Sequence, residues 1–346
     1  MKKCFNASTR LMSMSLVHLV AISCAGSDAS NPWPATESIT TLDDAVVWMR
    51  EIELDETDAV INVAPAVRVD PSGGFLIADS REVQLRRYSG SGELLRAFGR
   101  RGEGPGELRM PRVLIRAPGG NLLGFDFSFR LVVFDSTGAT VQRTVRTPFS
   151  RVDGAYRWDD SVVVVAGQLA GSTNQFMLHL WDVTGDSVRA SFFDPVSSDA
   201  VPLARSVGWA SVTQGTDYVV ATYSPTDTLY VLDRGGTTIR RIPIPIDGFR
   251  HIAPPPTRIA TPEWITSYDL VSAVHAMMDG HLLVEWMRPT LDERQWNLVL
   301  VAPDGSEVFT LYDTARLLTV INGVELVFVA PGSLTPNRWA IGRLRY

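Results

Sequence analysis

The sequence predicts an all-β protein, a six-bladed β-propeller of four-stranded antiparallel blades in which an N-terminal strand closes the ring against the C-terminal blade. Three observations support this prediction. Short hydrophobic runs alternate with glycine turns, one such turn recurs at similar intervals, and the last unit lacks a strand that an N-terminal segment can supply. With 45% hydrophobic and 20% charged residues, the 346-residue chain can form a packed core.

The first complete unit establishes the pattern of two hairpins joined by a loop. Its predicted strands are Ala66–Asp70, Phe75–Asp79, Gln84–Tyr88 and Glu93–Phe98, with the glycine turns PSGG and SGSG inside the two hairpins. A second unit repeats this order between Val113 and Val145. Later units keep the rhythm of strand and turn, so every unit is expected to be β-structure.

The second glycine turn of each unit gives the repeat length. It falls at Gly92, Gly138, Gly185, Gly235 and Gly305, which are 46, 47, 50 and 70 residues apart. Such spacings fit propeller blades of about 40–50 residues. The long last interval contains a proline-rich insert at 243–264, which is expected to fold over one face and narrow access to the channel. Thr261, Pro262 and Glu263 predict the start of a helix there.

The last unit, with strands at Val324–Ala330 and Arg338–Tyr346, lacks an outer strand. Ala45–Leu54 (AVVWMREIEL) is rich in β-forming residues and is predicted to supply it by pairing with the C-terminal strand. Closure of this kind removes open sheet edges. The alternative is a seven-bladed ring with a degenerate blade between residues 236 and 280.

The glycine-rich stretch Ala97–Leu108 (AFGRRGEGPGEL) is interpreted as a joint between blades. A phosphate loop of the GxxxxGK[ST] type needs a lysine, and the only lysines are Lys2 and Lys3. The dinucleotide fingerprint must open a helix, whereas Met110 and Pro111 lead into another strand. The glycines therefore serve to turn the chain from one blade to the next.

These same residues resemble a known family. FLIADSREVQLRRYSGSGE followed by AFGRRGEGPGELRMP looks like an NHL-type repeat, and the whole chain is similar to bacterial six-bladed propeller lipoproteins of that kind, also described as TolB-like. The motif is clear in the first blade, and the second keeps RLVVFDSTGA. The resemblance implies the fold and an exported location but no particular ligand.

The N-terminal segment is predicted to direct export. Residues 1–23 resemble a signal peptide, with Lys2, Lys3 and Arg10 before an apolar run, and VAISC resembles a lipobox ending at Cys24. We expect Cys24 to be lipidated, residues 24–38 to form a flexible tether, and residues 39–346 to form the propeller. The expected location is the periplasm or outer membrane, and the alternative is an ordinary signal peptide cut near residues 25–27.

Composition limits the possible partners and chemistry. Loss of the signal segment leaves 29 basic residues against 38 acidic ones, about −9 at neutral pH, so no general attraction to nucleic acid is expected. Without lysine or a free thiol, Schiff-base and cysteine chemistry are excluded from the mature chain. Membrane contact is expected only through the lipid, the chain is expected to be a monomer, and no cofactor is expected.

The favoured function is a non-catalytic binding or scaffolding module whose partner is a protein or an anionic envelope ligand. Loops that should share one face carry an arginine-rich rim, able to grip carboxylate or phosphate groups. This rim comprises Arg81, Arg100, Arg101, Arg109, Arg130, Arg288, Arg294 and Arg338. The alternative is that these arginines pair with nearby acids and brace their loops.

The enzymatic alternative is a calcium-dependent hydrolase or lyase, similar to six-bladed propellers of the gluconolactonase and paraoxonase types. The candidate calcium ligands are Asp79, Asp126 and Asp227, at or after strand ends, and Asn174 on a corresponding loop. Aspartate at such positions also forms turns, and that interpretation is favoured. Four histidines remain in the mature chain, and His179 and His281 lie in or beside strands, where a structural role is expected.

Overall fold

The computed structural model describes residues 39–55, 67–171, 176–194, 208–214, 218–253, 261–291, 293–333 and 337–345. The predicted signal peptide (1–23), Cys24 and the tether to residue 38 lie outside the described residues. Within the described part, no helix has the length and apolar character needed to cross a membrane.

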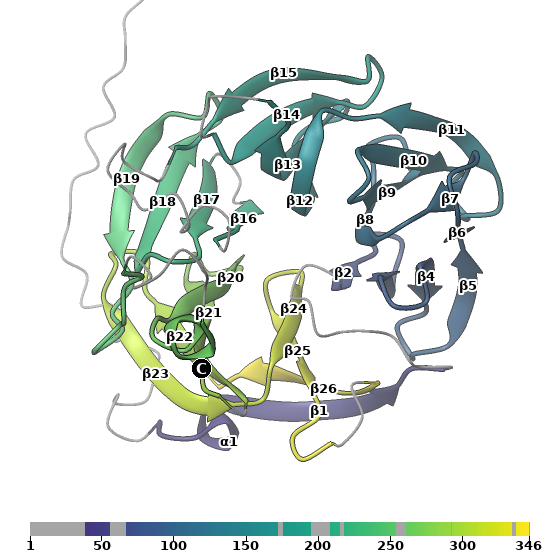
Figure 1. The fold of residues 1–346 in the computed structure, drawn as a ribbon. Helices are drawn as coiled ribbons and strands as arrows, with labels where there is room; N and C mark the ends of the chain where they lie inside the picture. Colours follow the sequence, from purple (N-terminus) through teal and green to yellow (C-terminus); the bar gives the residue numbers. More distant parts are fainter. Residues whose placement is uncertain are drawn as a thin grey trace, which may run out of the picture. The chain divides into compact units, whose positions relative to one another are not determined.

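Six four-stranded antiparallel sheets in the described residues form the blades of a β-propeller (Figure 1). We number the blades along the chain, and each runs from its inner to its outer strand. Blade 1 contains β2 (Val67–Val69), β3 (Phe75–Asp79), β4 (Gln84–Tyr88) and β5 (Leu94–Phe98). Blade 2 contains β8 (Pro111–Arg116), β9 (Leu122–Asp126), β10 (Arg130–Phe134) and β11 (Val141–Arg146). Blade 3 contains β12 (Phe149–Arg157), β13 (Val162–Leu169), β14 (Leu178–Asp182) and β15 (Ser187–Phe192).

The remaining blades follow the same order. Blade 4 contains β16 (Ala210–Gln214), β17 (Tyr218–Tyr223), β18 (Thr228–Asp233) and β19 (Thr238–Pro243). Blade 5 contains β20 (Leu270–Ala276), β21 (Leu282–Pro289), β22 (Arg294–Val301) and β23 (Glu307–Thr314). Blade 6 contains β24 (Leu317–Ile321), β25 (Glu325–Val329), β26 (Arg338–Leu344) and, from the other end of the chain, β1 (Val46–Glu53).

The six-bladed prediction is confirmed, and the seven-bladed alternative is wrong. In the described residues, 236–280 hold the end of blade 4, part of the insert and the inner strand β20, so they contain no extra blade. The middle strands of every blade match the predicted hydrophobic runs. The inner strands β12, β16, β20 and β24, whose residue ranges the sequence pattern did not predict, complete blades 3 to 6.

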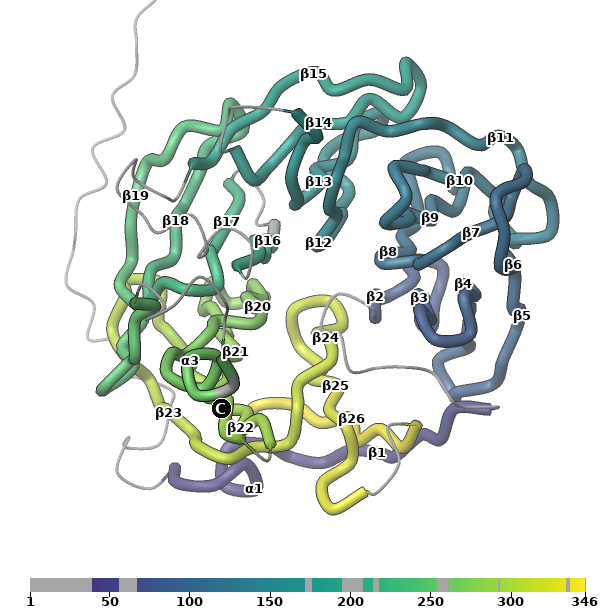
Figure 2. The backbone as a smooth tube through the Cα atoms, in the orientation of Figure 1, coloured from purple at the N-terminus to yellow at the C-terminus, as the bar shows by residue number. Residues whose placement is uncertain are grey.

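Closure of the ring has the predicted form. β1 lies antiparallel to β26, with a register that runs from Val46 opposite Leu344 to Glu53 opposite Arg338 (Figure 2). The short helix α1 (Leu42–Ala45) leads into β1, and its N-cap Thr41 and Asp44 form a reciprocal capping box. Val46 is fully buried in a cluster that includes residues of blades 5 and 6.

Neighbouring blades are joined by apolar packing and by buried ion pairs. Phe75 of blade 1 and Trp339 of blade 6 meet edge to face, with ring centroids 4.9 Å apart. Asp70 of blade 1 accepts from Arg116 of blade 2 at 2.7 Å through both carboxylate oxygens. Burial opposes ionisation of this carboxyl group, but the hydrogen bonds from Arg116 and Ser72 outweigh it and lower the pKa of Asp70 to about 2.

The glycine-rich stretch after β5 is a joint, as predicted. It forms two short parallel strands, β6 (Arg100–Arg101) and β7 (Glu107–Leu108), before the chain enters β8. Gly106 has a φ of 76°, and a Cβ there would lie 2.4 Å from a methyl group of Val141, so both conformation and space require glycine. Glu107 accepts from the Gly104 amide at 2.7 Å and fastens the loop.

The proline-rich insert packs on the end of blade 5. Its helix α3 (Pro262–Ile265) begins as predicted, with the Thr261 hydroxyl accepting from the Trp264 amide at 3.2 Å. Trp264 and Tyr268 form a buried cluster with Leu270 and Met287, and Figure 2 shows α3 beside β21 and β22. Trp209 packs against this cluster, so the described part of the insert supports an inner residue of blade 4. Residues 254–260 lie outside the described residues.

Replacement of Val46 by alanine tests the closing strand. Because Val46 is fully buried, Val46→Ala should lower the free energy of unfolding by about 2 kcal/mol. Val47→Ala is the matched control, since this neighbour in the same strand is 46% exposed and its loss should change stability by less than about 0.5 kcal/mol. Urea denaturation of both variants measures the difference, and equal effects would contradict the packing of β1 against the ring.

Candidate functional site

The predicted rim arginines come from blades 1, 2, 5 and 6 of the described structure. Five belong to blades 1 and 2 and their joint, two to blade 5 and one to blade 6. Arg100 donates to Glu107 at 2.8 Å, and Arg130 donates to the Gly104 carbonyl at 2.7 Å. Arg109 forms an ion pair with Glu103. These contacts hold the joint together, which is what the loop-bracing alternative describes.

The remaining rim arginines are engaged in a similar way or exposed. Arg288 pairs with the buried Asp269 at 2.8 Å, and Arg338 pairs with Glu51 at 2.7 Å. Arg101 lies 3.5 Å from the carbonyl oxygen of Arg81. Arg294 begins β22 and is exposed.

The three candidate metal ligands within the described residues lie in different blades. Asp79 accepts from the amides of Arg81 and Glu82 and pairs with Arg86, whereas Asp126 accepts from the amides of Arg109 and Met110. Both carboxylates therefore stabilise loops of their own blades. Asp227 lies 3.6 Å from His251 near the surface, and Asn174 lies outside the described residues. Among the described residues, no group of three or more acidic, histidine or cysteine side chains could hold a metal ion.

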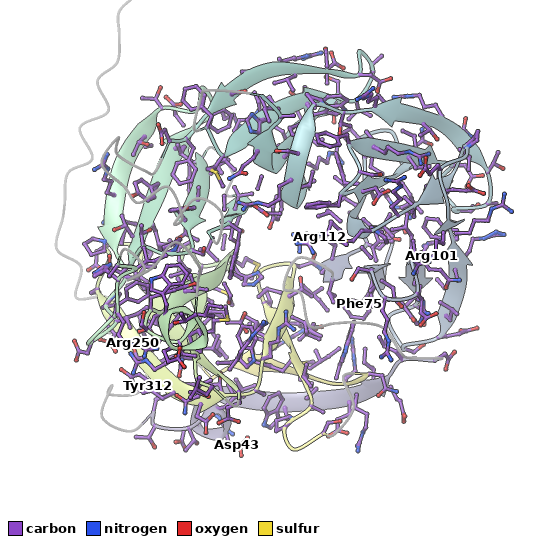
Figure 3. All side chains as sticks on the ribbon, in the orientation of Figure 1. Asp43, Phe75, Arg101, Arg112, Arg250 and Tyr312 are labelled. Carbon is purple, nitrogen blue, oxygen red and sulfur yellow. The ribbon has the colours of Figure 1, made fainter. Side chains whose placement is uncertain are left out.

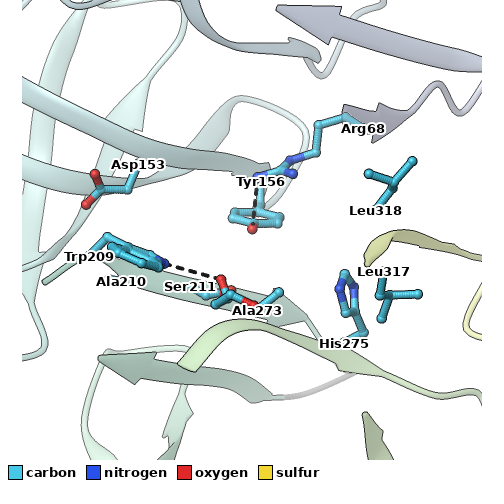
Figure 4. A pocket seen from close by; sticks show the side chains of 11 residues that line it. Arg68, Asp153, Tyr156, Trp209, Ala210, Ser211, Ala273, His275, Leu317 and Leu318 are labelled. Atoms are coloured by element: carbon cyan, nitrogen blue, oxygen red, sulfur yellow. Dashed lines mark hydrogen bonds between the residues drawn. The ribbon is translucent and has the colours of Figure 1, made fainter. Parts of the chain in front are cut away.

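The inner strands instead enclose a pocket, which we call the central pocket (Figure 4). It has an empty volume of about 410 Å³, part of which is continuous with solvent. Five of the six blades contribute to its wall, so the site exists only in the closed ring. Its lining residues are Arg68, Asp153, Tyr156, Trp209, Ala210, Ser211, Ser272, Ala273, His275, Leu317 and Leu318.

Strand register places three of these residues at one level of the ring. Arg68, Tyr156 and His275 pair with Leu76, Val164 and Leu283 of the second strands. Each lies two residues before a hairpin turn that is closed by a backbone hydrogen bond. These bonds run from the amides of Asp70, Trp158 and Met277 to the carbonyl oxygens of Gly74, Val162 and His281. Equivalent positions in three blades therefore present an arginine, a tyrosine and a histidine side by side.

A second level is formed by β-bulges in the inner strands. Arg112, Asp153 and Ser272 are each the extra residue where the register shifts in blades 2, 3 and 5. The three bulges occupy equivalent places in their blades. In each blade, the residue after the bulge pairs with a residue of the second strand that lies four positions after the end of the hairpin turn. These second-strand residues are Phe125, Ala166 and Glu285. Bulges redirect side chains, and these three introduce polar groups at the ring centre.

Arg68 reaches from blade 1 to blade 3. Its Nη2 donates to the Tyr156 hydroxyl at 3.1 Å, and its guanidinium carbon lies 4.8 Å from the centroid of the same ring. A Cβ on Gly154 would approach Nη2 to 3.2 Å, so glycine leaves room for the arginine. Its Nη1 donates to the Val67 carbonyl at 2.9 Å, whereas its buried Nε has no hydrogen-bond partner in the described residues.

Asp153 is committed to Arg151 within the same strand. Arg151 Nε lies 2.9 Å from one carboxylate oxygen, and Nη2 donates to the other at 3.1 Å. Burial raises the pKa of Asp153, while the charges of Arg151 and, more weakly, Arg112 oppose that shift. This carboxylate therefore serves mainly as the counter-ion of Arg151.

His275 is a neutral group in the pocket wall. Burial, and secondarily the charge of Arg68, lower the pKa of His275 to about 4. Its Nε2 is buried and has no hydrogen-bond partner among the described residues. At neutral pH the ring can therefore donate or accept one hydrogen bond to a ligand without adding charge.

Glu285 lies behind the pocket and links blades 5 and 6. Its carboxyl group accepts from the Ser272 hydroxyl at 2.5 Å and from the Leu317 amide at 2.7 Å. Burial raises the pKa of Glu285 to about 7, although the charge of Arg316 and the bond from Ser272 work in the opposite direction. Ser272 and Leu317 both line the pocket, so this acid supports two of its walls.

Sequence reasoning missed Arg68, Arg112 and Tyr156, and gave His275 no role. Only a register assignment for the inner strands, counted back from the hairpin turns, could have placed Arg68, Tyr156 and His275 together. Arg112 required the position of the bulge as well, which the hydrophobic pattern does not reveal.

Comparison with known proteins supports the fold alone. No protein-family model matches the sequence, and no curated protein matches it either. A Bacteroides fragilis protein described as exported has a similar structure, with a TM-score of 0.60 and 12% identity over 88% of this chain and 96% of its own. A member of the DUF4221 family from Bacteroides vulgatus has a TM-score of 0.61 and 9% identity over 87% of this chain and 97% of its own. At such low identity, these similarities establish the propeller and not its ligand.

Glu285 should make stability depend on pH near neutrality. The pKa of Glu285 in the folded protein is above its ordinary value of 4.5. Its contribution to the free energy of unfolding is therefore fully present below pH 4.5 and is lost as pH rises through about 7. Relative to Glu285→Gln, the wild type should lose up to about 3 kcal/mol of unfolding free energy between pH 5 and pH 8. Glutamine can keep the bond from Leu317, and exposed Glu82→Gln is the control. Parallel pH profiles for wild type and Glu285→Gln would refute this assignment.

Proposed function

We propose that this protein is an exported, lipid-anchored β-propeller of the cell envelope that binds an anionic ligand in its central pocket and does not transform it. The observation that supports this most directly is the pocket itself. Residues from five blades combine an arginine, a neutral histidine, hydroxyl groups and aromatic and aliphatic surfaces. A preformed concave site with a few convergent polar groups is typical of small-molecule recognition.

Export and anchoring are supported by the N-terminal sequence. The signal-like segment, the lipobox-like VAISC and the small, polar residues that follow Cys24 agree with one another. One structurally similar protein is described as exported. We further propose membership in the NHL-like, TolB-like propeller lipoproteins, on the motif that runs from blade 1 into its joint.

Binding without catalysis is supported by the partners of the acidic groups. Asp153 is held by Arg151, and Glu285 accepts from Ser272 and Leu317. A general base needs a proton within hydrogen-bond reach and a free lone pair aimed at it. Both acids instead stabilise the wall of the pocket.

Lipid anchoring predicts that Cys24 determines whether the protein is found in the membrane fraction or in the soluble fraction. In a Gram-negative host, the full chain should sediment with membranes, and Cys24→Ser should appear in the soluble periplasmic fraction, because one acyl-bearing residue supplies the attachment. Immunoblots of both fractions give the readout, with Cys4→Ser as the control for loss of the other cysteine. Wild type in the soluble fraction would exclude the anchor.

Ligand binding predicts a retained small molecule. Native mass spectrometry of wild-type protein from envelope extracts should show a bound species that is released with unchanged mass. Ala273→Leu should lose it, because the larger side chain occupies the pocket, whereas Ala139→Leu in an exposed turn of blade 2 should keep it. Equal occupancy in both variants would place the ligand elsewhere, and recovery of an altered molecule would indicate catalysis.

A further inference from the structure

We infer that the ligand carries a carboxylate or phosphate group, and that Arg112 and Arg68 bind this group at the ring centre. The inference rests on the proposed function, since it assigns the chemistry of the ring centre around the central pocket, whose lining includes Arg68 but not Arg112. It follows from three features of the described residues: a bulged arginine without a partner, a second arginine that reaches the neighbouring strand β12, and the local balance of charge.

Arg112 is the first feature. It is the bulged residue of β8, it is half-buried, and it lies on the inner side of the ring (Figure 3). Its guanidinium group makes no hydrogen bond or ion pair to any described residue, and its Nε is buried. Arginine is almost never left buried without a partner, because an unsatisfied charge in a protein interior is costly. A bulge that turns such a half-buried group inward therefore leaves it available to a ligand anion.

Arg68 is the second feature, and it reaches Tyr156 of blade 3, the blade that follows the one carrying Arg112. Its Nη2 lies beside Gly154 and donates to the Tyr156 hydroxyl, while Arg112 lies in β8, which packs against β12, at the bulge equivalent to that of Asp153. β8, the strand that carries Arg112, packs against both β2 and β12, the two strands that Arg68 connects. Adjacent blades thus place two arginines on inner strands next to β12.

The third feature is a local excess of positive charge. Arg151 already takes both oxygens of Asp153, and that acid is the only one in the pocket lining. No acidic group of the described residues lies within ion-pair distance of Arg68 or Arg112, and His275 is neutral at physiological pH. Planar guanidinium groups match the paired oxygens of carboxylate and phosphate. An anion with that geometry therefore supplies the negative charge that these arginines lack.

The test compares Arg112→Met with Arg100→Met in the full chain. Arg100 is the matched control because it is exposed and pairs with Glu107 on the joint, away from the ring centre. Acetate and inorganic phosphate are titrated separately at constant ionic strength, with chloride as the balancing anion, and binding is followed by thermal unfolding and by calorimetry. At least one anion should stabilise the wild type saturably. Its affinity should fall at least tenfold in Arg112→Met and change less than twofold in Arg100→Met.

Stability without added anion provides a separate readout. Arg112→Met removes a half-buried charge that has no partner, so its unfolding temperature should equal or exceed that of the wild type, and only the wild type should gain when the anion is added. Arg112→Lys keeps the charge without the planar fork and should bind with intermediate affinity. Stabilisation by phosphate alone or by acetate alone would identify the group, and stabilisation by both would assign their shared geometry.

Two results would overturn the inference: no saturable stabilisation of the wild type by either anion, or equal affinity in the wild type and Arg112→Met. The proposed function has a different signature. If Ala273→Leu abolishes the retained species in native mass spectrometry while Arg112→Met keeps it, the pocket binds a ligand without Arg112. In that case only the assignment of anion binding to Arg112 fails. If Ala273→Leu keeps it, the proposed use of the pocket fails.

Discussion

The pairing of β1 with β26 is the constraint on which the rest of the structure depends. A blade has two apolar faces, and each is buried only when a neighbour stands on both sides. Closure gives blade 6 its outer strand and brings Trp339 against Phe75 of blade 1, so that the last interface resembles the others. It also removes the open edge that a three-stranded final blade would expose. Only in the closed ring do inner strands of five blades face a common pocket.

The inner strands have a different chemical character because of their place in the ring. Middle strands such as β3 and β9 are buried along their whole length, whereas β12 and β20 carry polar side chains among apolar ones. Bulges at equivalent positions in blades 2, 3 and 5 interrupt the regular alternation and direct one residue each toward the centre. The recurrence of one backbone irregularity in three blades, each time with a polar residue, is more informative about a site than any single side chain.

This difference explains what the sequence could predict. The strands of blade 1 follow from hydrophobic runs separated by glycine turns, and the closing strand follows from the incomplete last unit. By contrast, FSRVDGAYR of β12 contains three charged residues and a glycine, so its pattern does not indicate a strand. The rim arginines were predicted from loop positions, and four of them pair with acids, as Arg100 does with Glu107. Arg68 and Arg112 could not be found this way, since their proximity depends on register and on a bulge between blades distant in sequence.

The electrostatics of the ring centre contrast with those of the whole molecule. The chain has a formal net charge of −6, yet Arg68 and Arg112 lie at the centre without acidic partners among the described residues. At physiological ionic strength, screening limits interactions between exposed charges to about 8 Å, so the net negative charge of the chain has little influence on a small anion inside the ring. A long polyanion would extend beyond these arginines and be repelled by that net charge. The arrangement therefore favours a compact anionic group that can enter the pocket over nucleic acid, in agreement with the charge of the chain as a whole.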